Sequence, residues 1–82
     1  MPYEAYDAID LGRAIRALRE QRGWTQAELA SWLDVNRSTI ITLEKGGSVS
    51  MTAAMKAIAL LGAKAIIVPK APPAGSASDT DG

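Results

Sequence analysis

The sequence of residues 25–46 is TQAELASWLDVNRSTIITLEKG, and its first half carries the signals of a helix start. Thr25 and Glu28 stand three residues apart, the spacing of a capping box, in which each side chain satisfies a backbone N–H at the start of a helix. Apolar residues then recur at helical spacing. The pattern predicts a helix over residues 26–33 that buries Leu29, Ala30 and Leu33.

A break and a second helical segment follow. Residues 34–36 interrupt the apolar pattern, and Asp34 tolerates a left-handed backbone, though less readily than glycine does. Asn36 is a good capping residue for a helix over residues 37–45, and Gly46 is a natural stop after it. Two short helices joined by a turn of three or four residues form a helix-turn-helix motif.

Further helices are predicted on both sides of this motif. Asp7 or Asp10 can cap the first of them, which we expect over residues 11–22. Its apolar stripe consists of Leu11, Ala14, Ile15 and Leu18. Ser50 can cap the other, over residues 51–61, whose stripe consists of Met51, Met55, Ile58, Ala59 and Leu61. The helical period of both stripes assigns them to the core.

The composition argues against an enzyme. The 82 residues include no cysteine and no histidine, so disulfides, thiolate metal sites and the commonest acid–base catalyst are absent. The sequence also lacks a phosphate-binding loop and an evident pair of catalytic carboxylates. We therefore expect no catalytic residue, metal or cofactor. No apolar run is long enough for a bilayer and the N-terminus does not resemble a signal peptide, so a cytoplasmic protein is the default expectation.

The formal net charge of zero hides a segregation of charge along the chain. All nine basic residues lie between positions 11 and 70, where only four acidic residues accompany them. The remaining acidic residues lie in the two ends. A basic body suits an anionic partner, although an ordinary solvated surface fits the same charges equally well.

The helix over residues 37–45 has an outer face suited to the major groove of DNA. Arginine can bond two acceptors on guanine, hydroxyl groups can serve either base, and an aliphatic group can pack on a thymine methyl. The candidate base-contacting residues are Arg37, Ser38, Thr39 and Thr42. Ile41 either joins this face or packs against a neighbouring helix.

Other side chains are placed to meet phosphates. Gln26 stands in the first turn of its helix, where its backbone N–H and side-chain amide can both meet an anion. Asn36 and Lys45 flank the other helix. Arg16 and Arg19 are further candidates, although a solvated surface explains arginines at such positions as well. The predicted phosphate contacts are Gln26, Asn36 and Lys45.

Trp32 falls off the apolar stripe of its helix. It either covers the edge of the core, the interpretation that we favour, or stands exposed as an anchor for a protein partner.

Residues 64–70 change the pattern. A β-branched run that ends in proline predicts a strand, with no second strand in the chain to pair with it. Pairing with the same strand of a second copy would give a twofold dimer, held by Ala65, Ile66, Ile67 and Val68. A terminal helix or an ordered coil is the alternative. The composition of residues 71–82 is that of a disordered tail.

These residues resemble the Cro/C1 (Xre) helix-turn-helix family of bacterial and phage repressors over about residues 11–62. The residues that carry the resemblance are Leu11-Gly12, Ile15-Arg16, Arg19, Trp24-Thr25-Gln26, Glu28-Leu29-Ala30, Val35, Ile40, Leu43-Glu44 and Gly46. Asp34 departs from the glycine usual there. The resemblance implies a lambda-repressor-like, all-α bundle of four to five helices. It also implies dimeric binding to a palindromic operator, with Gln26 on phosphate and with Arg37, Ser38, Thr39 and Thr42 on bases.

Residues 61–68 are similar to the corresponding part of HipB-type antitoxins, which dimerise through a short strand. This second resemblance implies autoregulation of an operon and a HipA-like kinase toxin as partner. The sequence thus predicts a lead-in (1–10), a DNA-binding domain (11–63), a dimerisation strand (64–70) and a tail (71–82). A stand-alone Xre-type regulator and a protein-interaction module without DNA binding are the alternatives.

Overall fold

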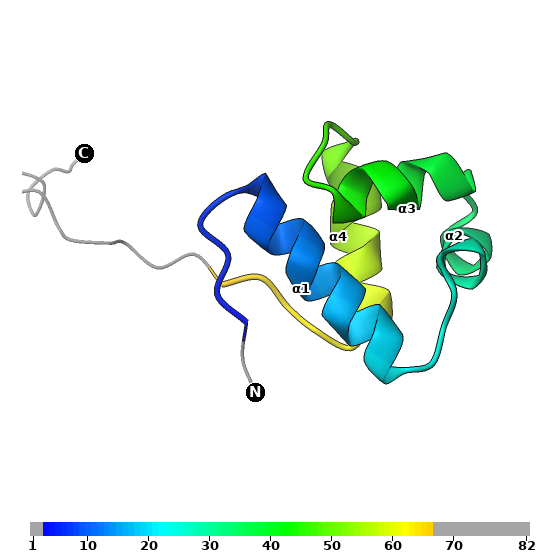
Figure 1. The fold of residues 1–82 in the computed structure, drawn as a ribbon, viewed down its shortest axis with the longest axis horizontal. Helices are drawn as coiled ribbons and strands as arrows, with labels where there is room; N and C mark the ends of the chain where they lie inside the picture. The colour runs from blue at the N-terminus through cyan, green and yellow to red at the C-terminus, as the bar shows by residue number, and fades with distance from the viewer. Residues whose placement is uncertain (1–2, 67–82) are drawn as a thin grey trace, which may run out of the picture.

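A computed structural model describes residues 3–66, which form four helices and contain no strand (Figure 1). The helices are α1 (Ala8–Gln21), α2 (Gln26–Leu33), α3 (Arg37–Glu44) and α4 (Met51–Leu60). The prediction of an all-α helix-turn-helix bundle is confirmed, with α2 and α3 as the motif. None of the described helices has the length and apolar character needed to cross a bilayer.

α1 begins three residues earlier than predicted, at Ala8. The Asp7 carboxylate accepts a hydrogen bond of 2.8 Å from the backbone N–H of Asp10, so Asp7 is the cap of the two that the sequence offered. The helix ends at Gln21, and Gly23 follows with a positive φ of 71°. That left-handed turn sends the chain on toward α2.

The α2–α3 unit follows the sequence signals closely. The capping box is formed, since the Glu28 N–H donates to Thr25 Oγ1 (3.0 Å) and the Thr25 N–H donates to Glu28 Oε1 (2.8 Å). Asp34 takes the left-handed conformation, with φ 57°. The predicted side-chain cap of Asn36 is wrong: Asn36 occupies the N-cap position of α3, but within the described chain its side chain makes no capping hydrogen bond.

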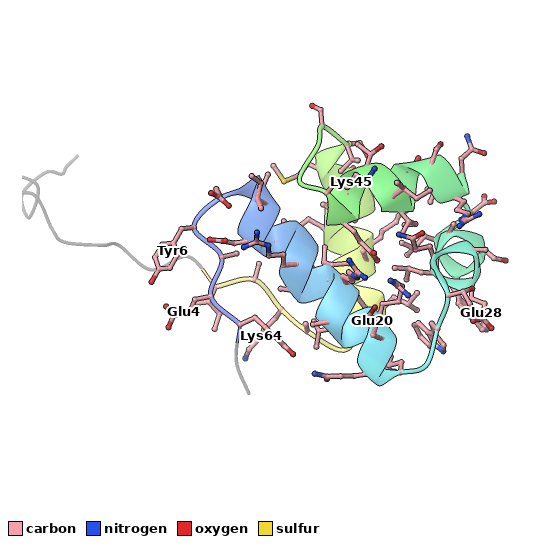
Figure 2. All side chains as sticks on the ribbon, viewed as in Figure 1. Glu4, Tyr6, Glu20, Glu28, Lys45 and Lys64 are labelled. Carbon is pink, nitrogen blue, oxygen red and sulfur yellow. The ribbon has the colours of Figure 1, made fainter. Side chains whose placement is uncertain are left out.

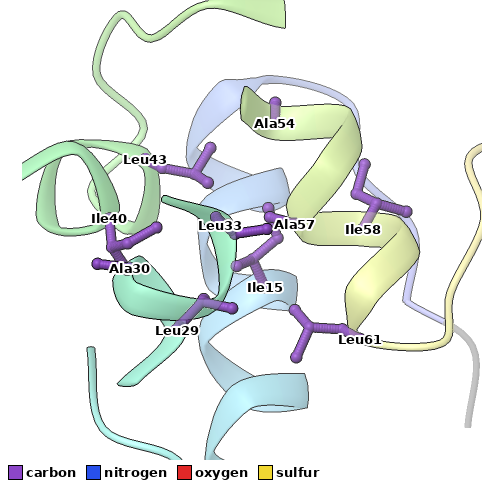
Figure 3. Close-up of a cluster of buried hydrophobic side chains, with 10 residues drawn as sticks. All are labelled: Ile15, Leu29, Ala30, Leu33, Ile40, Leu43, Ala54, Ala57, Ile58 and Leu61. Carbon is purple, nitrogen blue, oxygen red and sulfur yellow. The ribbon is translucent and has the colours of Figure 1, made fainter. Parts of the chain in front are cut away.

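The core lies where α1, α2, α3 and α4 converge (Figure 3). Ile15 of α1, Leu29 of α2 and Ile40 of α3 are almost completely buried. Burial of each such side chain contributes about 1.5–3 kcal/mol, so these three anchor the two motif helices onto α1. The other members of the cluster are Ala30, Leu33, Leu43, Ala54, Ala57, Ile58 and Leu61.

The predicted inner face of α4 is right at Ile58 and Leu61, which are buried, and wrong at its other three residues. Met51 is 76% exposed, Met55 is 46% exposed and Ala59 is also exposed. The buried face instead carries Ala53, Ala54, Ala57 and Ile58. Because alanine is small, this face lets α4 lie close to its neighbours. The helix is apolar on both sides, so helical period alone could not tell which side is buried.

The chain leaves the bundle after α4. Gly62 has a φ of 74°, and Lys64, Ala65 and Ile66 are exposed and have no regular secondary structure. Ile67 and Val68 lie outside the described residues. A strand needs a hydrogen-bonding partner, and residues 3–66 contain no strand to pair with this segment, so the dimerisation strand stays a prediction.

Candidate DNA-binding surface

The outer side of α3 carries the predicted base-contacting residues. Arg37 and Ser38 are exposed, while Thr39 and Thr42 are half-buried. Ser38, Thr39 and Thr42 line one shallow hollow of about 340 Å³ together with residues of the loop between α3 and α4. That loop contributes Ser48, Val49 and Ser50. The hollow therefore gathers hydroxyl groups, and Arg37 stands outside it at the helix start.

Ile41 is half-buried, so part of its side chain reaches the surface of α3 and part is shielded by the fold. Ile41 can therefore both join the outer face of α3 and pack against a neighbouring helix.

The predicted phosphate contacts lie around α3. Asn36 is exposed directly before the helix and Lys45 is exposed directly after it. Figure 2 shows Lys45 at the end of α3, with Lys64 well away from that helix. Gln26 is the first residue of α2 and is half-buried. Donors thus stand at both ends of α3 and at the start of α2.

Arg19, a further candidate for a phosphate contact, is buried and not available for one. Its Nε donates to Glu44 Oε2 (2.7 Å), its Nη2 donates to Glu44 Oε1 (3.1 Å) and its Nη1 donates to the Trp24 carbonyl (2.6 Å). The Arg19 side chain is 9% exposed and that of Glu44 is 3% exposed. The pair is a buried, two-pronged ion pair that joins α1 to α3.

The hydrogen bonds that Arg19 donates to Glu44 raise the pKa of Arg19 above its ordinary value, and burial opposes this only in part. The guanidinium therefore stays charged inside the fold. Burying an ion pair brings little net stability, but removal of one partner leaves an unpaired buried charge and is costly.

The sequence held a signal for this pair that we did not use. Arg19 stands four residues after Ile15, so it continues the buried stripe of α1. A charged residue on a core stripe needs an opposite charge. Glu44 follows the core residue Leu43, yet it did not enter the predicted site at all.

Gln26 joins this pair. Its Nε2 donates to Glu44 Oε1 at 3.2 Å. The Glu44 carboxylate therefore touches side chains from both α1 and α2, and the side-chain amide of Gln26 is held by the fold.

Trp32 is 65% exposed, so the favoured edge-of-core interpretation is not met. Its ring centroid lies 6.3 Å from that of Trp24, with the rings tilted by 31°. The Arg22 guanidinium lies 5.3 Å from the centroid of the Trp24 ring, and its Nη2 donates to the Leu61 carbonyl. Trp32 thus extends an aromatic cluster outward from the core, since the half-buried Trp24 packs against the core.

Comparison with known families decides the class of this fold. Residues 10–65 match the family described as helix-turn-helix domain. The chain belongs to that family. It is a Cro/C1-type helix-turn-helix protein, and the likeness to HipB expected from the sequence is confirmed by solved structures. This places it among helix-turn-helix DNA-binding regulators.

Two solved structures share the fold closely. A complex of a HipB variant with the O2 20mer has a TM-score of 0.76 and 26% identity, over 87% of this chain and 100% of that chain. A HipA-HipB-O2-O3 complex has a TM-score of 0.73 and 26% identity, over 83% of this chain and 97% of that one.

One curated relative is the competence pilus inhibition repressor of Acinetobacter baylyi (strain ATCC 33305 / BD413 / ADP1). It is 47% identical over 38 residues, which are 46% of this chain and 34% of that protein. The chain therefore spans about a third of the length of this relative.

Proposed function

We propose that this helix-turn-helix protein is a sequence-specific, DNA-binding transcriptional repressor that acts as a homodimer. The observation that carries the proposal is the outer side of α3, where Arg37, Ser38, Thr39 and Thr42 stand on a helix whose inner side is closed by the core. Support comes from the relative named as a repressor and from HipB structures whose names state complexes with 20mers.

In the proposed complex α3 lies in the major groove. Arg37 reads a guanine, and the hydroxyls of Ser38, Thr39 and Thr42 meet neighbouring base edges. Gln26, Asn36 and Lys45 contact phosphates and set the register, while base contacts supply the specificity. Two copies related by a twofold axis bind a palindromic operator, with half-sites about 34 Å apart.

The substitution Arg37→Ala tests this arrangement. Operator affinity should fall by about 1–3 kcal/mol, with relaxed preference at one base position, because a two-pronged contact to guanine is lost. The measurement is a gel shift at a fixed salt concentration with duplexes from the promoter of its own gene, each carrying a single base change.

Arg13→Ala is the matched control, since Arg13 is an exposed arginine of α1 that lies beside Tyr3 and Asp10. It should leave affinity and preference unchanged. Unchanged binding by the Arg37 variant would remove this residue from the site, and a wild-type protein that binds no promoter duplex would favour the protein-interaction module.

A more specific proposal is that this repressor is the antitoxin of a toxin–antitoxin pair. The structural neighbour in complex with HipA, a similarity that spans most of this chain, supports a HipA-like kinase toxin as the partner. The exposed Trp32, which packs beside Trp24 with the two rings tilted, supplies an anchor of the kind that protein interfaces favour. The product of the neighbouring gene separates an antitoxin from a stand-alone Xre-type regulator.

The proposed organisation of the chain follows from this role. Residues 11–63 bind DNA, residues 64–70 pair with a second copy, and residues 1–10 and 71–82 lie outside both units.

A further inference from the structure

Three helices meet at one buried carboxylate. Arg19 of α1 and Gln26 of α2 both donate to Glu44 of α3. We propose that Glu44 is a positioning residue for DNA binding, which fixes the Gln26 side-chain amide so that one of its N–H groups is left for a phosphate. This inference rests on the proposed function, because it assigns a role to Glu44 within the same DNA-binding site.

The chemistry of Glu44 determines how the amide must lie. With its carboxylate paired to the charged Arg19, Glu44 offers only acceptors. Gln26 must therefore turn its amide nitrogen, and not its oxygen, toward Glu44, as the 3.2 Å contact from Nε2 shows. A neutral partner such as another amide would accept either orientation.

The Gln26 amide has a second N–H group beyond the one that it donates to Glu44. An amide nitrogen carries two N–H groups, and Glu44 Oε1 takes one of them. Gln26 is the first helical residue, and the early N–H groups of a helix have no partner within the helix. The second amide N–H and the positive end of the helix dipole are thus available to the same anion.

A fixed amide has a further advantage over a mobile one. A free glutamine side chain loses rotamer freedom when it binds a phosphate, whereas a side chain already held by Glu44 has lost that freedom on folding. Arg19 contributes by holding the Glu44 carboxylate in place with two hydrogen bonds, and its third bond, to the Trp24 carbonyl, holds the loop that leads into α2.

A double-mutant cycle tests the inference with the full-length chain. Glu44→Gln should weaken binding roughly three- to tenfold, the worth of one hydrogen bond, on the promoter duplex and on a scrambled duplex alike. A phosphate contact carries no sequence information, so the ratio of the two affinities should stay unchanged. In a Gln26→Ala background, Glu44→Gln should have no further effect.

Equal losses in both backgrounds would show that Glu44 acts only through stability and would overturn the inference. Glu20→Gln is the matched control, since Glu20 also approaches Arg19, at 3.9 Å, but is 54% exposed and does not touch Gln26. It should leave binding unchanged.

A second measurement uses the wild-type protein alone and needs no substitution. In the DNA-free wild-type protein, nuclear magnetic resonance relaxation of the Gln26 side-chain amide should report a rigid group, with an order parameter close to that of the backbone. A mobile amide would overturn the inference. If Arg37→Ala weakens promoter binding but the effects of Glu44→Gln and Gln26→Ala on affinity simply add, only this inference fails. If the wild-type protein binds no DNA, both proposals fail.

Discussion

Gly12 lets α1 lie directly against the end of α3. A Cβ at this position would stand 2.5 Å from the carbonyl oxygens of both Leu43 and Glu44, far inside van der Waals contact. The two helices therefore approach to a distance that only glycine permits. The same approach lets Arg19, two turns further along α1, reach the Glu44 carboxylate.

Gly12→Ala should lower the free energy of unfolding by about 1–3 kcal/mol, because backbone atoms, which cannot rotate away, would have to shift. This loss should outweigh the better helix propensity of alanine. Urea unfolding followed by circular dichroism measures it. The exposed neighbour Arg13, changed to alanine, should stay within about 0.5 kcal/mol of wild type, and an equally stable Gly12→Ala variant would contradict the close approach.

Two residue-level predictions that rest on local signals succeeded, although the side-chain cap expected at Asn36 is not formed. The Thr25–Glu28 box and the left-handed Asp34 depend on neighbours within a few positions, and both are present. The Arg19–Glu44 pair joins residues 25 positions apart. The stripe of α1 indicates that Arg19 is buried, but which acidic residue pairs with it depends on how α1 packs on α3, and local patterns do not give that packing.

At the scale of elements, the four helices were predicted to within a few residues, but the orientation of α4 was not. A stripe of helical period marks a buried face only when the opposite face is polar. α4 carries apolar residues on both sides, and packing chose the alanine side, where the smaller side chains allow closer contact.

Two substitutions in α4 distinguish its faces. Ile58→Ala should lower the free energy of unfolding by about 2–5 kcal/mol, because Ile58 is 8% exposed and its loss leaves a cavity. Met51→Ala should change it by less than about 0.5 kcal/mol, since Met51 is 76% exposed. Urea unfolding compares the two, and a larger loss at Met51 would contradict the described packing.

At the scale of the whole molecule, a single copy of the bundle is not sufficient for the proposed repressor function. A single copy presents one α3, whereas a palindromic operator has two half-sites. The segment after α4 leaves the bundle with Lys64, Ala65 and Ile66 exposed, which keeps it free to meet another chain. The small core gives a further reason for association, since domains of this size bury little surface on their own.

Deletion of residues 64–82 should convert the protein from a dimer to a monomer, because the predicted intermolecular strand is then missing. Sedimentation equilibrium measures the mass of each form. Deletion of residues 71–82 alone is the control and should leave the dimer intact. A dimer that persists without residues 64–82 would place the interface elsewhere, and α4 with its exposed methionines would be the first surface to examine.

The tilted tryptophan pair gives the chain an optical reporter of its own. Trp24 and Trp32 are the two tryptophans of the sequence, one immediately before the capped start of α2 and the other within that helix. Their fluorescence therefore reports on one helix of the motif without any label. Emission from the half-buried Trp24 follows the docking of α2 on the core, while collisional quenching of Trp32 measures how far a bound partner shields that helix.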